Sequence, residues 1–353
     1  MELERQIPQL LLPWYDKAKR PLPWRADQEP YHVWISEVMC QQTRVEAVKG
    51  YYLRFLKALP GIRELAACPE DELHKLWEGL GYYSRARNLK RAAEIIANDH
   101  DGQFPTDYAS IRALPGIGDY TAAAIASICF DLPCPAVDGN VLRVVTRLTA
   151  SRLDVTQEAT KAEVREALRP LYSNAPCSEL TQAFMELGAL VCVPNHEPKC
   201  PECPLRSLCA SSDGGLWKEI PVKSPKKPRK TEVFTVFLLN CGGRFALRRR
   251  EEKGLLAGLW EFPNLSGRLG AQDALDTAKD WGCRPRTLLR QTERNHIFTH
   301  RNWELPAFLI LCEEMPDAFT WADIPEIEDL YSLPTAFRQF MEDIRIEPEG
   351  GTS

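Results

Sequence analysis

Two carboxyl side chains in the first half of the chain could share an acid–base reaction. Glu37 lies in the segment YHVWISEVMCQQTRV, off the apolar stripe that contains Ile35 and Val38. Asp138 lies in PAVDGNVLRV, before Gly139 and a hydrophobic run, where an aspartate ordinarily caps a helix. Cleavage of a glycosidic bond through an oxocarbenium-like transition state needs one carboxylic acid and one carboxylate at close range. Such a cleavage is therefore one hypothesis, beside a purely structural role for each residue.

A glycine-containing turn, Leu114-Pro-Gly-Ile-Gly118, precedes Asp119, Tyr120 and the small-residue run TAAAIASI. The two glycines, Gly116 and Gly118, allow a tight hairpin whose backbone N–H groups point outward at the start of a helix. Such a nest can bind a phosphate without any basic side chain. An ordinary packing turn between two helices is the alternative.

Four of the twelve cysteines crowd into one short segment, as Cys192, Cys200, Cys203 and Cys209. The other eight are scattered along the chain, which favours a reducing compartment over a disulfide framework. Zinc sites usually combine two well-separated pairs, whereas a compact run with unequal spacings is typical of an iron–sulfur cluster. The spacing therefore favours a cluster that braces a loop, with zinc and coincidental cysteines as alternatives.

The charge of the chain is unevenly distributed. The length of 353 residues predicts two domains, and the net charge is −5, whereas a nucleic-acid-binding protein is expected to be basic. Residues 302–353, however, hold 12 acidic side chains against two arginines, so the preceding residues sum to +5. The total charge therefore does not exclude DNA. No apolar run predicts a membrane span, and the amino-terminal segment does not resemble a signal peptide.

Helical periodicity covers almost all of the first 190 residues. Apolar residues follow a period near 3.6 from Trp34 onward, until Pro60-Gly61 ends the run. Further helical stretches are predicted at 70–80, 85–98, 119–130, 140–150, 158–172 and 178–191. Because little strand-like alternation occurs, we predict an all-α domain over residues 1–210, with the cysteine loop 192–209 at its end.

The pattern changes in the last third of the chain. Residues 211–230 are polar, rich in proline and lysine, and without periodicity, which predicts an interdomain linker. Beyond it, EVFTVFLLN, RFALRRR and WELPAFLILC predict strands, while DALDTAKDWG and SLPTAFRQFMEDI predict helices. A second, α/β domain is therefore expected over residues 231–345.

The order of these motifs resembles the helix-hairpin-helix glycosylase superfamily. LPGIGDYTAAAIASI, PAVDGNVLRV and the cysteine loop carry that resemblance, and WISEVMCQQTRV, GLGYYSRARNL and MELGALVC are similar to the MutY family of adenine DNA glycosylases. The similarity runs nearly continuously over residues 14–209. It implies a monomeric base-excision-repair enzyme that removes adenine paired with 8-oxoguanine, and also with guanine, in duplex DNA.

The resemblance also implies a 4Fe–4S cluster on Cys192, Cys200, Cys203 and Cys209. The first gap between these cysteines holds seven residues, where six are usual in the family. The loop geometry therefore departs from the family pattern.

The resemblance assigns roles to the two carboxyl groups and their neighbours. Glu37 would protonate N7 of the extruded adenine and later act on the attacking water. Asp138, oriented by Asn140, would stabilise the positive charge at C1′, and Tyr120 would support that intermediate. An apolar pocket suits a protonated Glu37, and the helix N-terminus suits an ionised Asp138.

Position 120 bears on the reaction class. Superfamily members that nick the strand carry a lysine there, which forms a Schiff base with the sugar. This chain has Tyr120 instead, and residues 91–160 contain no lysine. The resemblance therefore implies a monofunctional glycosylase that leaves an abasic site.

Other positions match residues that contact DNA or the base in the family. Extrusion of a base leaves a gap in the stack that a side chain must fill. The residues expected to enter the stack or read the oxidised base are Gln41, Gln42, Leu80 and Tyr82, those expected to line the adenine pocket are Trp24 and Arg25, and those of the DNA-binding hairpin are Gly116 and Gly118.

The second domain resembles the Nudix-like C-terminal domain of the same family. GLLAGLWEFPN, at 254–264, is close to the segment before a Nudix box, but the clustered carboxylates that bind Mg²⁺ in true Nudix hydrolases are missing. The domain is therefore expected to recognise oxidised guanine rather than to hydrolyse nucleotides. Its recognition loop would contain Phe298, Thr299 and His300, with Thr299 where the family has serine.

Three other functions fit parts of the sequence. A pyrimidine-damage glycosylase-lyase of the endonuclease III type would share the fold, but Tyr120 and the second domain argue against it. A non-catalytic DNA-binding protein is disfavoured by the presence of both Glu37 and Asp138, and a nucleotide hydrolase by the missing carboxylates. The short length indicates a bacterial protein of the cytoplasm, associated with the nucleoid and not with a membrane.

Overall fold

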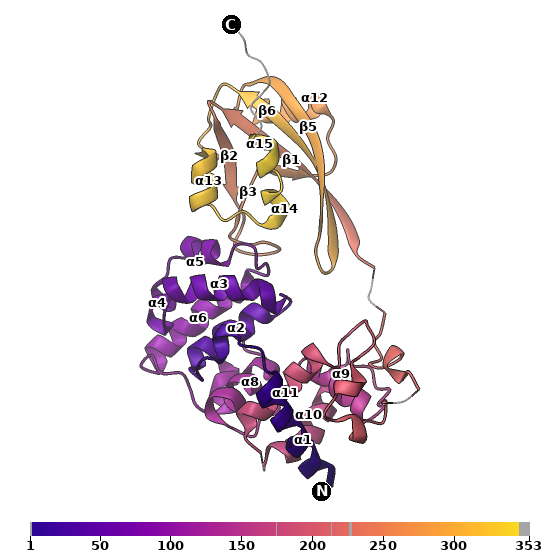
Figure 1. Cartoon of the computed structure of the whole chain (residues 1–353). Helices are drawn as coiled ribbons and strands as arrows, with labels where there is room; N and C mark the ends of the chain where they lie inside the picture. The colour runs from indigo at the N-terminus through magenta and orange to yellow at the C-terminus, as the bar shows by residue number, and fades with distance from the viewer. Residues whose placement is uncertain (1, 174, 213, 226–227, 346–353) are drawn as a thin grey trace. The chain divides into compact units, whose positions relative to one another are not determined.

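The computed structural model describes residues 2–173, 175–212, 214–225 and 228–345. The chain divides into two compact units (Figure 1). The first comprises Met1–Cys68 and Arg87–Pro225, and the second comprises Pro69–Ala86 and Lys226–Ser353. Positions 213, 226 and 227 of the predicted linker lie outside the described residues, as does the end of the acidic segment, 346–353.

The first unit is helical, which confirms the predicted all-α architecture. Its helices are α1 (Glu2–Ala18), α2 (Pro30–Cys40), α3 (Val45–Ala58), α4 (Ile62–Ala67), α6 (Ser84–Asp99, which begins in the second unit), α7 (Tyr108–Ala113), α8 (Asp119–Phe130), α9 (Gly139–Leu148), α10 (Glu158–Tyr172) and α11 (Cys177–Leu190). No helix among the described residues is long and apolar enough to span a membrane.

The long apolar period predicted from Trp34 to Pro60 is broken in the structure. Helix α2 ends at Cys40, the backbone of Gln42 takes a left-handed φ of 61°, and α3 begins at Val45. The turn was not predicted because Gln41–Arg44 contains neither glycine nor proline, the residues that usually mark such a break.

The predicted helix-hairpin-helix forms between α7 and α8. Gly116 takes a φ of 76°, and a Cβ atom there would lie 2.6 Å from Cβ of Asn88. The backbone conformation and the lack of space therefore both require glycine at this position. Gly118 follows as the N-cap residue of α8, so that the hairpin leads directly into the helix that carries Tyr120.

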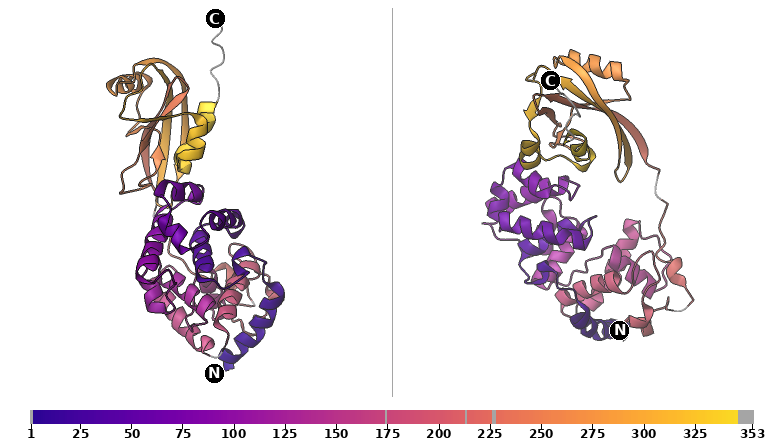
Figure 2. Two further views of the ribbon diagram at one scale, coloured as in Figure 1. Left: turned by 90° about the vertical axis from the view of Figure 1, so that its left-hand side faces the viewer. Right: turned by 45° about the horizontal axis from the view of Figure 1, so that its top comes forward.

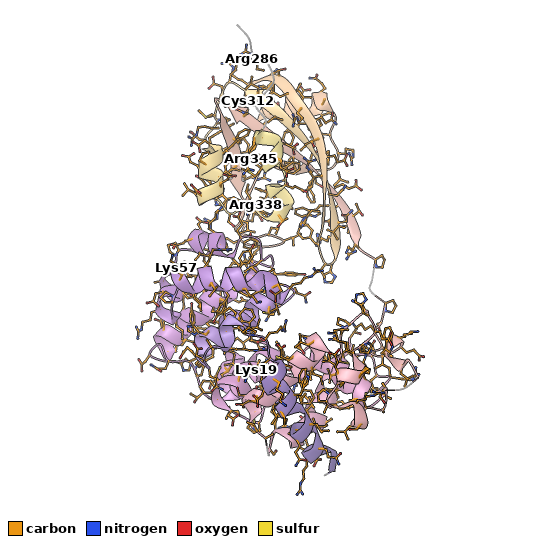
Figure 3. The ribbon with its side chains drawn as sticks, viewed as in Figure 1. Lys19, Lys57, Arg286, Cys312, Arg338 and Arg345 are labelled. Atoms are coloured by element: carbon orange, nitrogen blue, oxygen red, sulfur yellow. The ribbon has the colours of Figure 1, made fainter. Side chains whose placement is uncertain are left out.

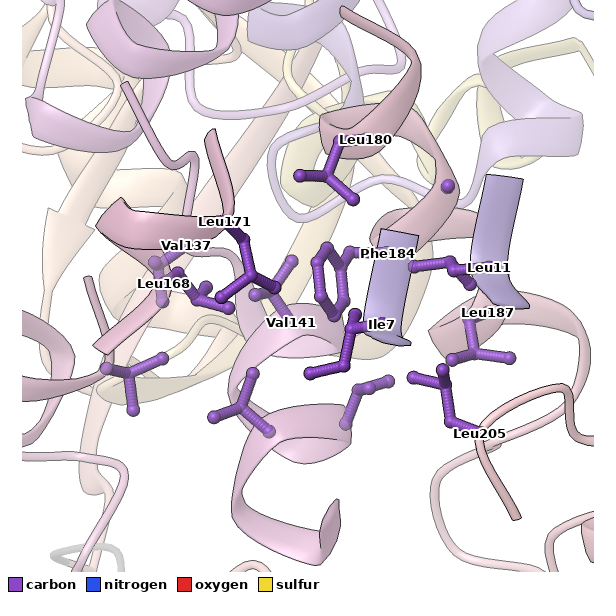
Figure 4. Close-up of a cluster of buried hydrophobic side chains, with 14 of the residues drawn as sticks. Ile7, Leu11, Val137, Val141, Leu168, Leu171, Leu180, Phe184, Leu187 and Leu205 are labelled. Atoms are coloured by element: carbon purple, nitrogen blue, oxygen red, sulfur yellow. The ribbon is translucent and has the colours of Figure 1, made fainter. Parts of the chain in front are cut away.

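One hydrophobic core joins four helices and the cysteine loop (Figure 4). Leu11 from α1, Val141 from α9, Leu171 from α10 and Phe184 from α11 pack together, and Leu205 joins them from the loop. Burial of each such side chain stabilises the fold by about 1.5–3 kcal/mol. This core therefore fixes the first turn of α9 relative to α11 and to the cysteine loop.

The second unit is built on a mixed β-sheet. Its strands are β1 (Lys230–Cys241), β2 (Arg244–Arg249), β3 (Trp260–Glu261), β4 (Asn264–Ser266), β5 (Pro285–Ile297), β6 (Arg301–Cys312) and β7 (Thr320–Ala322). The main path runs β3-β2-β1-β6-β5, with β4 paired to β1 and β7 to β2. Strands β1 and β6 are parallel, and the other pairs are antiparallel.

Helices cover both faces of this sheet (Figure 2). Along β1, Val236 and Leu238 pack in the cluster that contains Phe337, on the side of α13 (Ile324–Leu330), α14 (Thr335–Arg338) and α15 (Met341–Arg345). Phe237 of the same strand packs in the cluster on the opposite face, where α12 (Ala271–Asp280) contributes Ala274. This alternation is the period of two expected for a strand that is buried on both faces.

The segment before α6 also belongs to the second unit. Its helix α5 (Glu70–Trp77) packs on α13, and Lys75 donates through Nζ to the carbonyl oxygen of Tyr331 at 3.4 Å. Arg338, labelled in Figure 3, lies 3.0 Å from the carboxylate of Glu78. The sequence pattern did not predict that α5 packs with residues some 250 positions later in the chain.

Candidate active site

A cavity of about 1470 Å³ in the first unit is lined by both carboxyl side chains singled out from the sequence. Glu37 comes from the last turn of α2, and Tyr120 from the first turn of α8. Asp138 is the N-cap residue of α9. Three elements that are distant in the sequence therefore meet at one cavity, as the catalytic hypothesis requires.

Glu37 is surrounded by protein and has few hydrogen-bond donors. Tyr120 donates its hydroxyl proton to Oε2 of Glu37 across 2.5 Å. Burial raises the pKa of Glu37 to about 7, with a further increase from the negative charge of Asp138, against the Tyr120 hydrogen bond and the positive charge of Arg25, which lower it. Burial also keeps the Tyr120 phenol protonated, because it raises the pKa of that group well above its ordinary value. Glu37 can therefore hold a proton near neutral pH.

Asp138 is better supplied with donors. It accepts hydrogen bonds from the backbone N–H of Val141 and from Nδ2 of Asn140, each at 2.7 Å. We expected the helix N-terminus to favour the ionised form, but the pKa of Asp138 is raised, because burial outweighs the hydrogen bonds from Val141 and Asn140 and the positive charge of Arg143. The two carboxyl groups therefore differ mainly in the number of donors that they face.

The amide of Asn140 is held in place by Arg143. The guanidinium of Arg143 donates to Oδ1 of Asn140 at 2.9 Å, to the carbonyl oxygen of Gly188 at 2.9 Å and to that of Cys192 at 2.7 Å. Because Oδ1 is occupied, Nδ2 of Asn140 points at Asp138. A Cβ atom on Gly188 would lie 2.5 Å from Cβ of Asn140, so only glycine allows α9 and α11 this close.

A buried charge cluster forms another wall of the cavity. The carboxylate of Glu186, which is 0% exposed, lies 2.7 Å from Nη2 of Arg25. It also accepts hydrogen bonds from Nε and Nη2 of Arg20, at 3.0–3.1 Å. Neither Glu186 nor Arg20 was predicted as a site residue. The available signal was a glutamate inside the otherwise apolar helix segment QAFMELGALV.

Most of the predicted DNA-contacting and pocket residues of the first unit line the same cavity. Trp24 packs edge-on against Tyr52, with ring centroids 5.3 Å apart, and Nε2 of Gln41 donates to the Thr121 hydroxyl at 3.3 Å. The predicted residues that share this cavity with Glu37 are Trp24, Arg25, Gln41, Gln42, Gly116, Gly118, Tyr120, Asp138 and Asn140.

The remaining predicted residues lie in the second unit. There the hydroxyl groups of Tyr82 and Thr299 share a short hydrogen bond. Tyr82 is 49% exposed and has a φ of 47°, whereas Leu80 is only 5% exposed. Phe298, in the loop between β5 and β6, packs edge-on against Trp303, with ring centroids 4.8 Å apart. His300 is exposed in the same loop.

The four clustered cysteines follow α11. Burial and, to a smaller extent, negative charge on the other three thiols raise the pKa of Cys203 to about 11, against a hydrogen bond with the Leu205 backbone that lowers it. Arg147, which is 4% exposed, donates from Nη1 to Sγ of Cys192 at 3.4 Å. In the described part of the chain, no group of three His, Cys, Asp or Glu side chains is close enough to hold a single metal ion.

Comparisons with known proteins identify the family of this chain. A family model described as HhH-GPD superfamily base excision DNA repair protein matches residues 35–170, and a NUDIX domain model matches residues 235–343. An adenine DNA glycosylase of Mus musculus is 32% identical, over 94% of this chain and 77% of the relative. The chain belongs to the adenine DNA glycosylase family. Members of this family are hydrolases that act on N-glycosidic bonds of DNA.

Two further comparisons cover parts of the chain. The adenine DNA glycosylase of Buchnera aphidicola subsp. Baizongia pistaciae is 38% identical over 72% of each chain. The solved structure of a thermostable thymine-DNA glycosylase superposes with a TM-score of 0.54 at 27% identity, over 60% of this chain and 97% of that one. The predicted fold, a helix-hairpin-helix glycosylase domain followed by a Nudix-like domain, is thus confirmed.

The raised pKa of Glu37 predicts a cost in stability at high pH. The folded protein retains the Glu37 proton up to about pH 7, whereas a glutamate in the unfolded chain loses it near pH 4.5. The contribution of this proton to stability is therefore complete below pH 4.5 and is lost as the pH rises to 7. Glu37→Gln should raise the free energy of unfolding at pH 8 by about 3 kcal/mol, and change it little at pH 4.5.

Urea denaturation at the two pH values measures this difference. Glu72→Gln, a change at an exposed glutamate of α5, is the control and should show no such gain. An equal effect of Glu37→Gln at both pH values would mean that burial does not hold the proton on this carboxyl group.

Proposed function

We propose that this protein excises adenine paired with 8-oxoguanine, and more slowly adenine paired with guanine, by hydrolysis of the N-glycosidic bond in duplex DNA. The observation that carries the proposal is the placement of Glu37 and Asp138 at one cavity. Glu37 accepts a hydrogen bond from Tyr120, and Asp138 accepts hydrogen bonds from Asn140 and Val141. A carboxylic acid and a carboxylate so arranged are what this reaction needs.

The reaction follows from these two groups. Protonated Glu37 gives its proton to N7 of the extruded adenine, and the bond from C1′ to N9 then breaks, with its electron pair leaving on the base. Asp138 stabilises the positive charge that remains on the sugar. Water attacks C1′ and returns a proton to Glu37, which restores the starting state. Asn140 and Tyr120 hold the two carboxyl groups through the hydrogen bonds already described.

The proposal includes release of an intact abasic strand. The phenol of Tyr120 occupies the place beside Glu37 and cannot form a Schiff base. Two lysines line the cavity, of which Lys161 binds Glu158 and Lys223 is exposed. Neither is held next to Asp138 by a hydrogen bond among the described residues.

A gel assay tests substrate and reaction class together. Duplexes with adenine opposite 8-oxoguanine, guanine, cytosine or thymine are incubated with the protein, with and without later alkali treatment. The strand should break only after alkali, and fastest opposite 8-oxoguanine. Glu37→Gln should bind the duplex but slow base release by at least about 100-fold, as loss of a general acid does. Strand breaks without alkali, or normal turnover by Glu37→Gln, would contradict the proposal.

We further propose that Tyr82 and Thr299 recognise the oxidised guanine. Their shared hydrogen bond places an exposed aromatic ring and a hydroxyl group side by side in the second unit, next to Phe298 and His300 in the loop. An aromatic ring can stack on a base, and a hydroxyl group can exchange hydrogen bonds with a purine edge. Leu80 is buried and would have to be uncovered before it could enter the stack, so Tyr82 is the better wedge.

Thr299→Val keeps the size of the side chain and removes its hydroxyl group. We expect the preference for 8-oxoguanine over guanine to fall by about 3- to 10-fold, the effect of losing one neutral hydrogen bond. Thr287→Val, the same change at an exposed position near the other end of β5, is the control. The preference is measured as a ratio of single-turnover rates, and an unchanged ratio would remove Thr299 from recognition.

We propose that the four clustered cysteines hold a 4Fe–4S cluster. The donor set fits, because thiolates are the usual ligands of such clusters, and the thiols of Cys192, Cys200, Cys203 and Cys209 are close enough for their charges to interact. Burial raises the pKa of Cys200, Cys203 and Cys209, so a bound cluster would supply the positive charge that stabilises their thiolates, and Arg147 donates a hydrogen bond to Sγ of Cys192. Such a cluster would brace the loop that packs Leu205 into the core.

The purified protein should be yellow-brown, absorb near 400 nm and contain about four iron and four sulfide ions per chain. Cys203→Ser should lose most of this absorption, whereas Cys134→Ser, outside the loop, should retain it. A colourless protein that contains zinc would contradict the proposal.

The remaining proposals concern context. The hairpin of Gly116 and Gly118 would bind a DNA phosphate through backbone N–H groups. We propose domain limits at residues 210 and 231, action as a monomer, and a bacterial cytoplasmic location at the nucleoid.

A further inference from the structure

The charge cluster of Glu186, Arg20 and Arg25 lies in the wall of the cavity that contains Glu37. It links Glu186 on α11 to the segment that follows α1. In that segment Arg20 lies just after α1, and Arg25 is the last residue of a short 3-10 helix, Pro23–Arg25. One carboxylate faces two guanidinium groups, so the cluster carries a net positive charge. Its carboxylate is fully buried, whereas the side chains of Arg25 and Arg20 are 14% and 28% exposed.

Arg25 is held by three kinds of contact. Its Nη2 lies 2.7 Å from Oε1 of Glu186, and its Nη1 donates to the carbonyl oxygen of Arg20 at 3.2 Å. The guanidinium also lies over the ring of Tyr15, 5.9 Å from the centroid, and the Tyr15 hydroxyl donates to Gln182 at 3.2 Å. These contacts direct the guanidinium of Arg25 toward α11. Glu37 is nevertheless near enough for the positive charge of Arg25 to lower the pKa of Glu37.

Removal of Glu186 would change this balance. Arg25 would lose its carboxylate partner in a place shielded from solvent, while Glu37 lines the same cavity and is close enough for the charge of Arg25 to act on it. An ion pair with Glu37 would stabilise the carboxylate form and thus deprive the site of its acid. The charged or titratable groups that line the cavity with Glu37 are Arg20, Arg25, Cys40, Arg44, Glu46, Arg112, Asp119, Tyr120, Asp138, Glu158, Lys161, Arg165, Glu186 and Lys223. Cys129 on α8 is also close enough for its charge to interact with Glu37.

We propose that Glu186 is a positioning residue for this reaction: it holds Arg20 and Arg25 and prevents Arg25 from forming an ion pair with Glu37. The inference rests on the proposed function of Glu37 as the acid. Glu186 itself does not touch the base in this scheme. It acts through Arg25, which stays available to line the pocket for adenine without removing the proton that the leaving base needs.

The test is the pH profile of single-turnover base release by the full-length protein. Because Glu37 acts in its protonated form, the rate falls at alkaline pH. Glu186→Gln keeps the shape of the side chain and removes its charge. The pH at which the rate begins to fall, the alkaline limb of the profile, should then be lower by about one unit, so that base release at pH values above it is about tenfold slower than in the wild type. Glu186→Asp, which keeps the charge, should retain the wild-type limb.

Two variants control for general effects. Glu179→Gln removes the same charge from α11 without an ion pair to either arginine among the described residues, and it should leave the limb in place. Arg20→Gln removes one positive charge and leaves Glu186 to Arg25 alone, so the limb should move to higher pH. This opposite shift tests the proposal even if Glu186→Gln fails to fold, as judged by thermal unfolding.

The outcomes separate this inference from the proposed function. Unchanged limbs in folded Glu186→Gln and in Arg20→Gln would overturn the role of Glu186 and leave adenine excision standing. If the wild-type protein releases no adenine, carbon-13 NMR of labelled glutamate, with Glu37→Gln for assignment, still reads the protonation of Glu37. A lower pKa of Glu37 in Glu186→Gln would then support the inference, and an equal one would overturn it.

Discussion

The candidate active site depends on the free-energy cost of burying the negative charge of Glu37. Glu37 lies in the wall of a cavity, where burial outweighs the Tyr120 hydrogen bond and the charge of Arg25, so it keeps its proton to a higher pH than a carboxyl group in water. Asp138 is buried too, but the N–H of Val141 and the amide of Asn140 both point at it. The same solvent exclusion thus gives two carboxyl groups different chemistry, because the scaffold supplies them with different numbers of donors.

The donors at Asp138 are maintained from several directions. Asn140 lies on the first turn of α9, where Val141 enters the core and Arg143 binds the carbonyl oxygens of Gly188 and Cys192. The cysteine loop begins at that same Cys192. A structural cluster in the loop would therefore act on the site without chemistry of its own, because it would fix the carbonyl oxygen that orients Arg143. The absence of a side chain at Gly188 brings the two helices close enough for this network to form.

The sequence predicted elements with a strong period and residues with a distinctive motif. Helices α6 and α8–α11, strands β1, β2 and β6, and the hairpin were recognised in this way, whereas α2 and α3 were predicted as one run and α1, α4 and α7 had no predicted range. Strand β5 was not predicted, because its residues PRTLLRQTERNHI are mostly polar and only every second one is partly buried. Its strand form depends on pairing with β6 along nearly its whole length, which is a tertiary interaction.

The same limit applied to the site. Glu37, Asp138 and Tyr120 could be named from motifs, and the structure brings them to one cavity. Glu186 could not, because its importance lies in Arg20 and Arg25, which stand more than 160 residues away in the sequence. A glutamate between apolar residues of a helix signals a buried partner but does not identify it. The upward shift in the pKa of Asp138 was not predicted for a related reason. The sequence indicates the helix N-terminus but does not indicate how deeply the carboxyl group is buried.

The second unit holds a buried carboxylate that is already paired with positive charges. The buried carboxylate of Glu261, 2% exposed, is bound by Arg248 at 2.8 Å and by Arg250. A carboxylate already neutralised by two guanidinium groups is a poor ligand for Mg²⁺, which prefers charged oxygens free of competing cations. In the exposed loop between β5 and β6, the ring of Phe298 packs against Trp303. The Thr299 hydroxyl group of the same loop shares a hydrogen bond with Tyr82, which follows α5. These contacts support the proposal that the loop recognises a nucleobase.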